Sequence, residues 1–262
     1  MTCQNGTTDT RLSQAVDRKG QMHMATVLIL AVARTLGGLT VAGMTTQHDK
    51  VTGLCWVRPT RERGPVQVAD LTTRNHQVLR PFDVVEINLL RHRPIPPLIE
   101  NWVTDFGDHP RILRRLKGER RQRFLHKYCD RAPRQVLQGQ QRSLCLIKAQ
   151  AVTGSFRSEA NSANIDARLR FRSAGRAYDG SYVRGGLATT DLRWLEMGSR
   201  WLAESDGWIE FDARVLETRL GIEEIYLVVS LSYTEQRRFE PVIIGVHTVP
   251  EYQIPVATDQ SD

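Results

Sequence analysis

The densest group of chemically active side chains in this sequence lies between residues 111 and 142. This segment contains 11 Lys or Arg residues and only two acids, Glu119 and Asp130. The segment's charge of +9 exceeds the whole chain's +7, which leaves −2 for the remainder. Cations without acidic partners bind phosphates, because such binding releases the counterions of a nucleic acid. We expect phosphate contacts from Arg111, Arg114, Arg115, Lys117, Arg120, Arg121 and Arg123. The alternative is a solvated helix face, which most charge runs are.

A second candidate site is the element Trp56-Val57-Arg58-Pro59. An indole beside a guanidinium can stack a nucleobase and hold its phosphate, which makes Trp56 a candidate stacking residue and Arg58 a candidate phosphate ligand. The alternative is a core tryptophan whose neighbouring arginine bonds backbone carbonyl groups of a loop. We expect Trp56 to support the integrity of its domain more than ligand contact.

Other polar groups give little support to catalysis. Glu100, Asn101 and Asp105 follow a proline-rich loop and are expected to order it through bonds to the backbone. Four acids between residues 204 and 212 lack the spacing of a metal-binding loop and predict an acidic surface. The four cysteines form neither a close pair nor a Cys/His quartet, and neither a phosphate loop nor a nucleophile elbow is present. The sequence therefore favours a protein with no catalytic residues, no metal and no cofactor over an enzyme.

The elements that must position these residues are mostly strands. Between residues 165 and 173, apolar side chains alternate with charged ones, which indicates a half-buried antiparallel strand with a basic outer face. Further strands are expected at residues 26–34, 39–44, 54–59, 82–90, 143–152, 224–232 and 241–249. A partial helical stripe predicts a helix over 109–129, and a short helix over 190–203 would be capped by Thr190 and Asp191.

These elements predict a mainly β protein with some α structure, built from two OB-like β-barrel modules that are joined by a basic helical segment. The expected parts are a disordered tail (1–24), a first barrel (25–108), a basic connector (109–142), a second barrel (143–250) and a loose tail (251–262). The longest apolar run is far shorter than the about 20 residues of a membrane span, and no signal peptide is evident. We expect a cytoplasmic protein with no membrane partner.

Several short motifs, in their order along the chain, resemble the prokaryotic dual OB-containing domain family. The likeness begins in LILAVARTLGGLTVAG and spans about residues 26–247. The matching positions are Arg34, Gly37, Gly38, Ala42, Gly43, Trp56, Arg58, Pro59, Glu100, Asn101, Thr190, Asp191 and Trp194. Val32-Ala33 and Thr40 depart from the family's usual Asn-Ser and Cys, which puts any site built on those polar groups in question.

The resemblance implies two OB folds and a nucleic-acid-related role in bacterial conflict systems such as phage defence, without implying a catalytic mechanism. We therefore expect a non-catalytic nucleic-acid-binding protein, with DNA and RNA both open as ligands and a protein from the same operon as a candidate partner. The alternative is a protein-interaction or scaffold subunit of a multi-gene defence system. An enzyme with an unrecognised site is the weakest of the three hypotheses.

Overall fold

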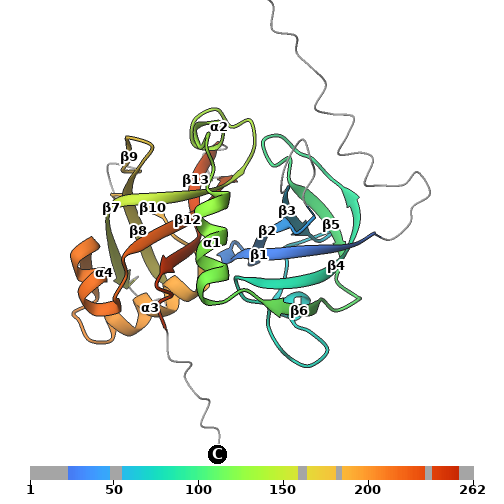
Figure 1. Cartoon of the computed structure of the whole chain (residues 1–262), viewed down its shortest axis with the longest axis horizontal. Helices are drawn as coiled ribbons and strands as arrows, with labels where there is room; N and C mark the ends of the chain where they lie inside the picture. Colours follow the sequence, from blue (N-terminus) through green and yellow to red (C-terminus); the bar gives the residue numbers. More distant parts are fainter. Residues whose placement is uncertain (1–22, 48–54, 159–163, 181–184, 234–237, 254–262) are drawn as a thin grey trace, which may run out of the picture.

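A computed structural model describes residues 23–47, 55–158, 164–180, 185–233 and 238–253 of the chain. Two strand-rich bodies lie side by side, and helix α1 runs between them (Figure 1). The elements of the first body are β1 (His23–Thr35), β2 (Gly38–Thr45), β3 (Trp56–Thr60), the 3-10 helix η2 (Val68–Leu71), β4 (Asp83–His92), β5 (Asn101–Asp105) and β6 (Arg111–Arg115). Helices α1 (Gly118–Tyr128) and α2 (Arg134–Leu137) follow. The elements of the second body are β7 (Leu144–Ser158), β8 (Ile165–Ser173), β9 (Arg176–Tyr178), β10 (Leu187–Ala188), α3 (Leu192–Leu202), β11 (Trp208–Asp212), α4 (Ala213–Leu220), β12 (Glu224–Tyr233) and β13 (Phe239–Val249).

The first body is a closed five-stranded barrel. Its strands follow the order β1-β2-β3-β5-β4, and β4 pairs back with β1. The pairing of β3 with β5 is parallel, whereas β1 is antiparallel to both of its neighbours. Strand β1 is apolar on both faces because both are covered: Val27 and Ile29 lie in the barrel core, and Leu28 and Leu30 pack toward the second body.

The strands of the second body have an equivalent order. Its sheet runs β10-β8-β7-β12-β13, and a parallel bridge between Thr189 and Ile243 joins the two ends. Starting from β7, the closed order is therefore β7-β8-β10-β13-β12, which corresponds to β1-β2-β3-β5-β4 in the first barrel. The amide of Thr190 donates to the Ile243 carbonyl oxygen at 2.8 Å across the same junction. Strands β9 and β11 extend the sheet beside β8 and β7. The predicted mainly β fold with two OB-like modules is thus confirmed.

Helix α3 forms where the sequence predicts it, and for the predicted reason. The Asp191 carboxylate accepts a hydrogen bond from the Trp194 amide at 2.8 Å, which satisfies one of the open donors at the helix start. The apolar face of α3 then buries Trp194 and Trp201 against Phe156 in the core of the second barrel.

A continuous apolar core joins the two barrels and α1. Leu28 and Phe82 come from the first barrel, Leu125 from α1, and Leu146 and Tyr226 from the second barrel, and all belong to one buried cluster. The barrels are therefore packed directly against each other and not separated by a spacer.

Three predicted boundaries are wrong. Residues 111–115 are the strand β6 and not helix, because their backbone pairs with β4 of the first barrel; the helix begins only at Gly118. The strand β1 already begins at His23, and the rest of the predicted N-terminal tail lies outside the described residues. Tyr252 is not part of a loose tail, because its ring is buried in the second barrel; residues 254–262 lie outside the described part.

Within the described part, no helix is long and apolar enough to cross a membrane.

Candidate nucleic-acid interface

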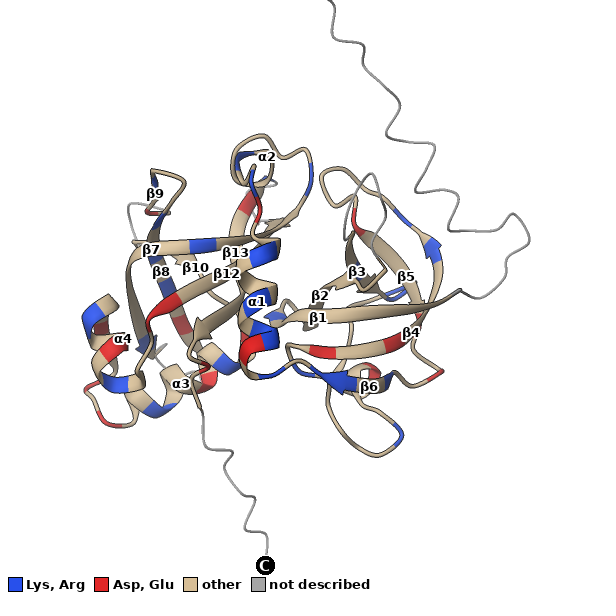
Figure 2. Cartoon of the chain, viewed as in Figure 1, with Lys and Arg blue, Asp and Glu red and all other residues tan. Residues whose placement is uncertain are grey.

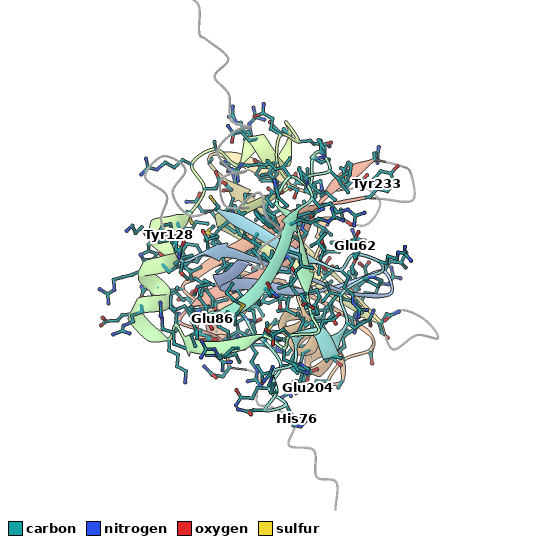
Figure 3. The ribbon with its side chains drawn as sticks, turned by 90° about the vertical axis from the view of Figure 1, so that its right-hand side faces the viewer. Glu62, His76, Glu86, Tyr128, Glu204 and Tyr233 are labelled. Atoms are coloured by element: carbon teal, nitrogen blue, oxygen red, sulfur yellow. The ribbon has the colours of Figure 1, made fainter. Side chains whose placement is uncertain are left out.

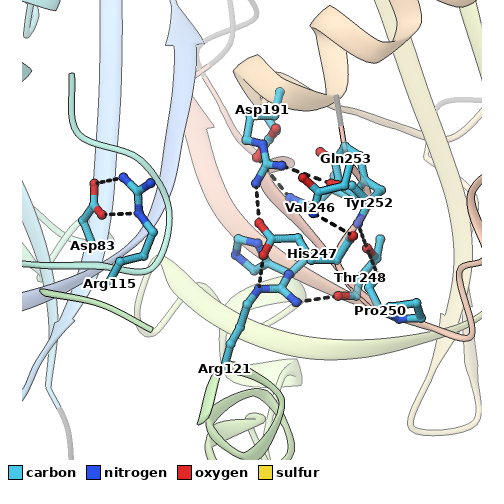
Figure 4. A network of polar contacts seen from close by, with 12 residues as sticks. Asp83, Arg115, Arg121, Asp191, Val246, His247, Thr248, Pro250, Tyr252 and Gln253 are labelled. Carbon is cyan, nitrogen blue, oxygen red and sulfur yellow. Dashed lines mark hydrogen bonds and ion pairs between the residues drawn. The ribbon is translucent and has the colours of Figure 1, made fainter. Parts of the chain in front are cut away.

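Arg121 of the basic segment is a structural residue. It is 4% exposed, and its Nη1 donates to the Thr248 carbonyl oxygen at 2.6 Å (Figure 4). Its guanidinium lies over the Phe82 ring, 4.6 Å from the ring centre, so the side chain ties α1 to both barrels. Burial lowers the pKa of Arg121. A phosphate cannot reach this guanidinium, and the predicted phosphate contact is therefore wrong for Arg121.

Two arginines of β6 are engaged by acids of β4. Arg115 binds the buried Asp83 through two bonds, Nε to Oδ1 at 2.6 Å and Nη2 to Oδ2 at 3.0 Å (Figure 4). The side-chain hydrogen bond to Asp83 raises the pKa of Arg115. Arg111 donates from Nε to the Glu86 carboxylate at 2.8 Å. Both cations are neutralised in place, so they fasten β6 to the barrel and contribute little attraction for phosphate.

Other cations of the segment are exposed, whereas Arg142 is half-buried and paired with Asp130. Arg114, Lys117, Arg120 and Arg123 form no ion pair with any other described residue. Lys127 is also exposed, and its ammonium lies 5.2 Å from the centre of the Tyr128 ring. We call these five residues the β6–α1 cationic surface.

The geometry of α1 gathers this charge on one side. Arg120, Arg123 and Lys127 are three and four residues apart, which places them on one helix face. Lys and Arg residues mark β6, at the lower edge of the first barrel, and α1, which lies between the two barrels (Figure 2). Seen from the end of the first barrel, α1 lies at the edge of the molecule, ends at the labelled Tyr128, and carries long side chains that project into solvent (Figure 3). Since Glu119 is the single acid of the helix, little opposes binding of an anion here.

Arg58 lies in the contact between the barrels. It is 6% exposed and donates to the hydroxyl oxygens of Ser143 at 2.9 Å and Ser230 at 2.8 Å. Burial lowers the pKa of Arg58 to about 10, so the guanidinium remains charged at neutral pH, opposite the charge of Glu100. The predicted role as a phosphate ligand is therefore wrong, because the second barrel covers this face of β3.

Trp56 also faces the second barrel. Its side chain is half-buried and packs against the apolar core shared by the two barrels. This position supports the expectation that Trp56 serves the integrity of the fold, and it leaves little of the ring free to stack a base.

Glu100 serves the same contact. Its carboxylate accepts hydrogen bonds from the Ser143 amide at 2.9 Å, the Ser143 hydroxyl at 2.6 Å and the Leu144 amide at 3.1 Å. The prediction that Glu100 orders its own loop is therefore wrong, because its partners lie at the start of β7 in the other barrel. Asp105 does order its loop, accepting from the Gly107 amide at 2.9 Å.

A second buried polar cluster lies beside α1, and Arg121 reaches into it (Figure 4). Besides capping α3, Asp191 accepts from the Val246 amide at 3.1 Å, and burial raises the pKa of its carboxyl to about 6. His247 Nε2 donates to the Leu30 carbonyl oxygen at 2.7 Å, and burial lowers the pKa of its imidazole to about 3. Both side chains are almost fully buried, so this cluster joins elements and is closed to substrates.

Trp208, which was not among the residues predicted from the sequence, is 60% exposed on β11. The signal is the alternation along the strand: Ile209 and Phe211 contact the barrel core, so Trp208 and Glu210 must point outward.

In the described part of the chain, no group of three or more His, Cys, Asp or Glu side chains is arranged to hold a metal ion.

Comparison with known proteins identifies one family. A family model described as a dual OB-containing domain matches residues 25–186, which is more than half of the chain. The match covers the first barrel, α1, α2 and the opening strands of the second barrel. A search of curated proteins and a search of solved structures found no match.

Proposed function

Since the chain belongs to the dual OB-containing domain family, we propose that it binds single-stranded nucleic acid, without catalysing a reaction, through the β6–α1 cationic surface. The observation that carries the proposal is the group of exposed cations, Arg114, Lys117, Arg120 and Arg123, that lack acidic partners among the described residues. OB barrels commonly hold single strands in a cationic groove beside aromatic side chains.

The packing of the barrels explains why the ligand would use this surface. OB folds usually bind oligonucleotides on the face of their second and third strands. In the first barrel that face includes Trp56 and Arg58, and the second barrel covers it. The exposed cations of α1 lie at the junction of the two barrels and those of β6 at the edge of the first barrel, where a strand can approach from solvent.

The family resemblance also supports a biological setting. We place the protein in the bacterial cytoplasm as a component of a conflict or phage-defence system, with a protein encoded in the same operon as a candidate partner. DNA and RNA are both compatible with a surface that reads phosphates, because phosphate contacts carry no sequence information.

The test is a fluorescence-anisotropy titration of labelled single-stranded DNA and RNA at several salt concentrations. Four phosphate contacts to a single strand predict that the logarithm of the binding constant falls with the logarithm of salt concentration with a slope of about −3. Absence of binding at low salt would overturn the proposal, and a protein-interaction subunit would then be the better account.

A further inference from the structure

The outer face of strands β11, β7 and β8 carries an exposed aromatic ring beside unpaired cations. Trp208 is 60% exposed, and in the sheet register it lies opposite Arg157 of β7. The next outward row places Glu210 opposite Ser155. The alternate residues of β11, Ile209 and Phe211, point inward and contact the core of the second barrel. We call this surface the Trp208 face.

Three cations of this face have no acidic partner in the described part of the chain. Arg157, Arg170 and Arg172 are exposed, and none of them forms an ion pair with a described residue, whereas Arg168 is bound by Asp166 at 2.7 Å. Two residues along a strand advance about 6.6–6.8 Å, a step comparable to that between consecutive phosphates of an extended nucleic-acid strand. Arg170 and Arg172 are separated by one such step.

A hollow lies between Arg170 and β11. It has a volume of about 370 Å³, and its lining includes Thr153, Ser155, Arg170, Glu210 and Asp212. The Arg170 guanidinium lies so close to Gly185 that a Cβ atom there would overlap it, which sets the guanidinium at the rim of the hollow.

The two acids of the hollow have different roles. Asp212 caps α4, accepting from the Val215 amide at 2.9 Å. Glu210 is exposed and has no hydrogen-bond or ion-pair partner among the described residues. A carboxylate repels phosphate, but it is the acceptor that reads the exocyclic amino group of cytosine. Such an acceptor on the same strand as an exposed indole fits a nucleobase better than it fits a phosphate.

We propose that the Trp208 face is a base-recognition site for single-stranded nucleic acid. Trp208 stacks on the base, Glu210 accepts a hydrogen bond from its exocyclic amino group, and Arg157 and Arg170 hold the flanking phosphates. This inference rests on the proposed function and adds what the β6–α1 cationic surface lacks, a preference for cytosine over thymine.

The experiment measures binding of oligo(dC) and oligo(dT), by anisotropy and by intrinsic tryptophan fluorescence. Trp208 is the exposed tryptophan, because Trp102, Trp194 and Trp201 are buried and Trp56 is half-buried. Wild-type protein should bind oligo(dC) more tightly than oligo(dT), with quenching of its emission. Trp208→Ala should weaken oligo(dC) binding by about 5- to 150-fold, the range for loss of one stacked base, and abolish the quenching.

Two further variants make the result specific. Tyr233, which is 59% exposed on β12, offers a matched aromatic control, and Tyr233→Ala should bind as wild type does. Glu210→Ala removes the acceptor from an exposed position, so the preference for oligo(dC) should disappear while oligo(dT) affinity stays equal or rises. This second readout holds even if Trp208→Ala folds poorly.

The outcomes separate this inference from the proposed function. Wild-type binding that is salt-dependent, but unaltered by Trp208→Ala and equal for the two oligonucleotides, would overturn the base-recognition site and leave the proposed function standing. Failure of the wild-type protein to bind any single strand would overturn both.

Discussion

Arg58 of the first barrel donates a hydrogen bond of 2.8 Å to the hydroxyl of Ser230 in the second barrel, 172 residues further along the chain. The same guanidinium donates to Ser143, whose hydroxyl in turn donates to Glu100. Buried polar groups are stable only when they are paired, so these bonds fix how the barrels sit against each other.

Replacing Arg58 with Ala should therefore destabilise the whole protein. The change removes two buried bonds from a charged donor and leaves Glu100 without the opposing charge, which we expect to lower the free energy of unfolding by about 3–5 kcal/mol. Urea denaturation followed by circular dichroism should still show one transition, because the barrels share a core. Arg114→Ala, at an exposed arginine, is the matched control and should change stability by no more than about 0.5 kcal/mol. Two separate transitions, or a loss below about 1 kcal/mol, would contradict the account.

We predict that Gly198→Ala, in the middle of α3, destabilises the protein although alanine has a higher helix propensity than glycine. Alanine is favoured over glycine inside a helix by about 1 kcal/mol. A Cβ atom at position 198, however, would overlap the ring of Phe156, which is fully buried among Trp194, Trp201 and Phe211 and cannot move aside. Overpacking typically costs about 1–3 kcal/mol, so Gly198→Ala should lower the melting temperature. Ser199→Ala, one residue along on the exposed side, should keep or raise it.

His247 should make stability depend on pH. Its ordinary pKa is 6.5, and burial lowers the pKa in the folded protein to about 3, next to the positive charges of Arg121 and Arg193. The unfolded chain therefore takes up a proton near pH 6.5, whereas the folded protein does not. Stability that is present above pH 6.5 is lost as the pH falls toward 3. Asp191 acts in the opposite sense, because burial raises its pKa from 3.8 to about 6, so its contribution is lost as the pH rises through that range.

A comparison with His247→Gln isolates the histidine, because the contribution of Asp191 is common to both proteins. A glutamine amide can still donate to the Leu30 carbonyl but does not titrate. The free energy of unfolding of wild type, minus that of the variant, should fall by about 3 kcal/mol between pH 6.5 and pH 4. Denaturant titrations at several pH values measure this difference. A difference that does not change with pH would show that His247 takes up its proton over the same pH range in the folded and the unfolded protein.

The barrels could be predicted from the sequence because their strands carry clear patterns. Ile165 to Ser173 alternates, and its bounds are those of β8. Strand β6 could not be predicted, because Arg111 to Arg115 has little strand propensity and becomes a strand through its tertiary partners, Asp83 and Glu86 on β4.

The site was harder to predict than the fold, because an arginine in a sequence does not show where its head group lies. Arg120 and Arg121 are neighbours with the same side chain, yet one is exposed and the other is buried over Phe82. Likewise Arg58 belongs to a strand whose outer face would be open in a single barrel, and only the second barrel closes it. Packing between domains, which local patterns do not encode, therefore divided the predicted binding residues into exposed and structural ones.

We expect the exposed cations of β6 and α1 to bind nucleic acid. The most direct test compares two variants with the same change in charge. The first variant replaces Arg114, Lys117, Arg120 and Arg123 with Gln. The second variant replaces four other exposed residues of the first barrel with Gln: Arg63, Arg74, Arg80 and Arg91. All eight side chains are exposed and Gln is polar, so both variants should fold.

The measurement is the salt dependence of single-stranded oligonucleotide binding by both variants and the wild-type protein. We expect the first variant to bind more weakly, with a slope that flattens by about 0.7 for each lost phosphate contact, whereas the second should keep nearly the wild-type slope. Equal losses in the two variants, or a folded first variant that binds as wild type does at low salt, would contradict this expectation.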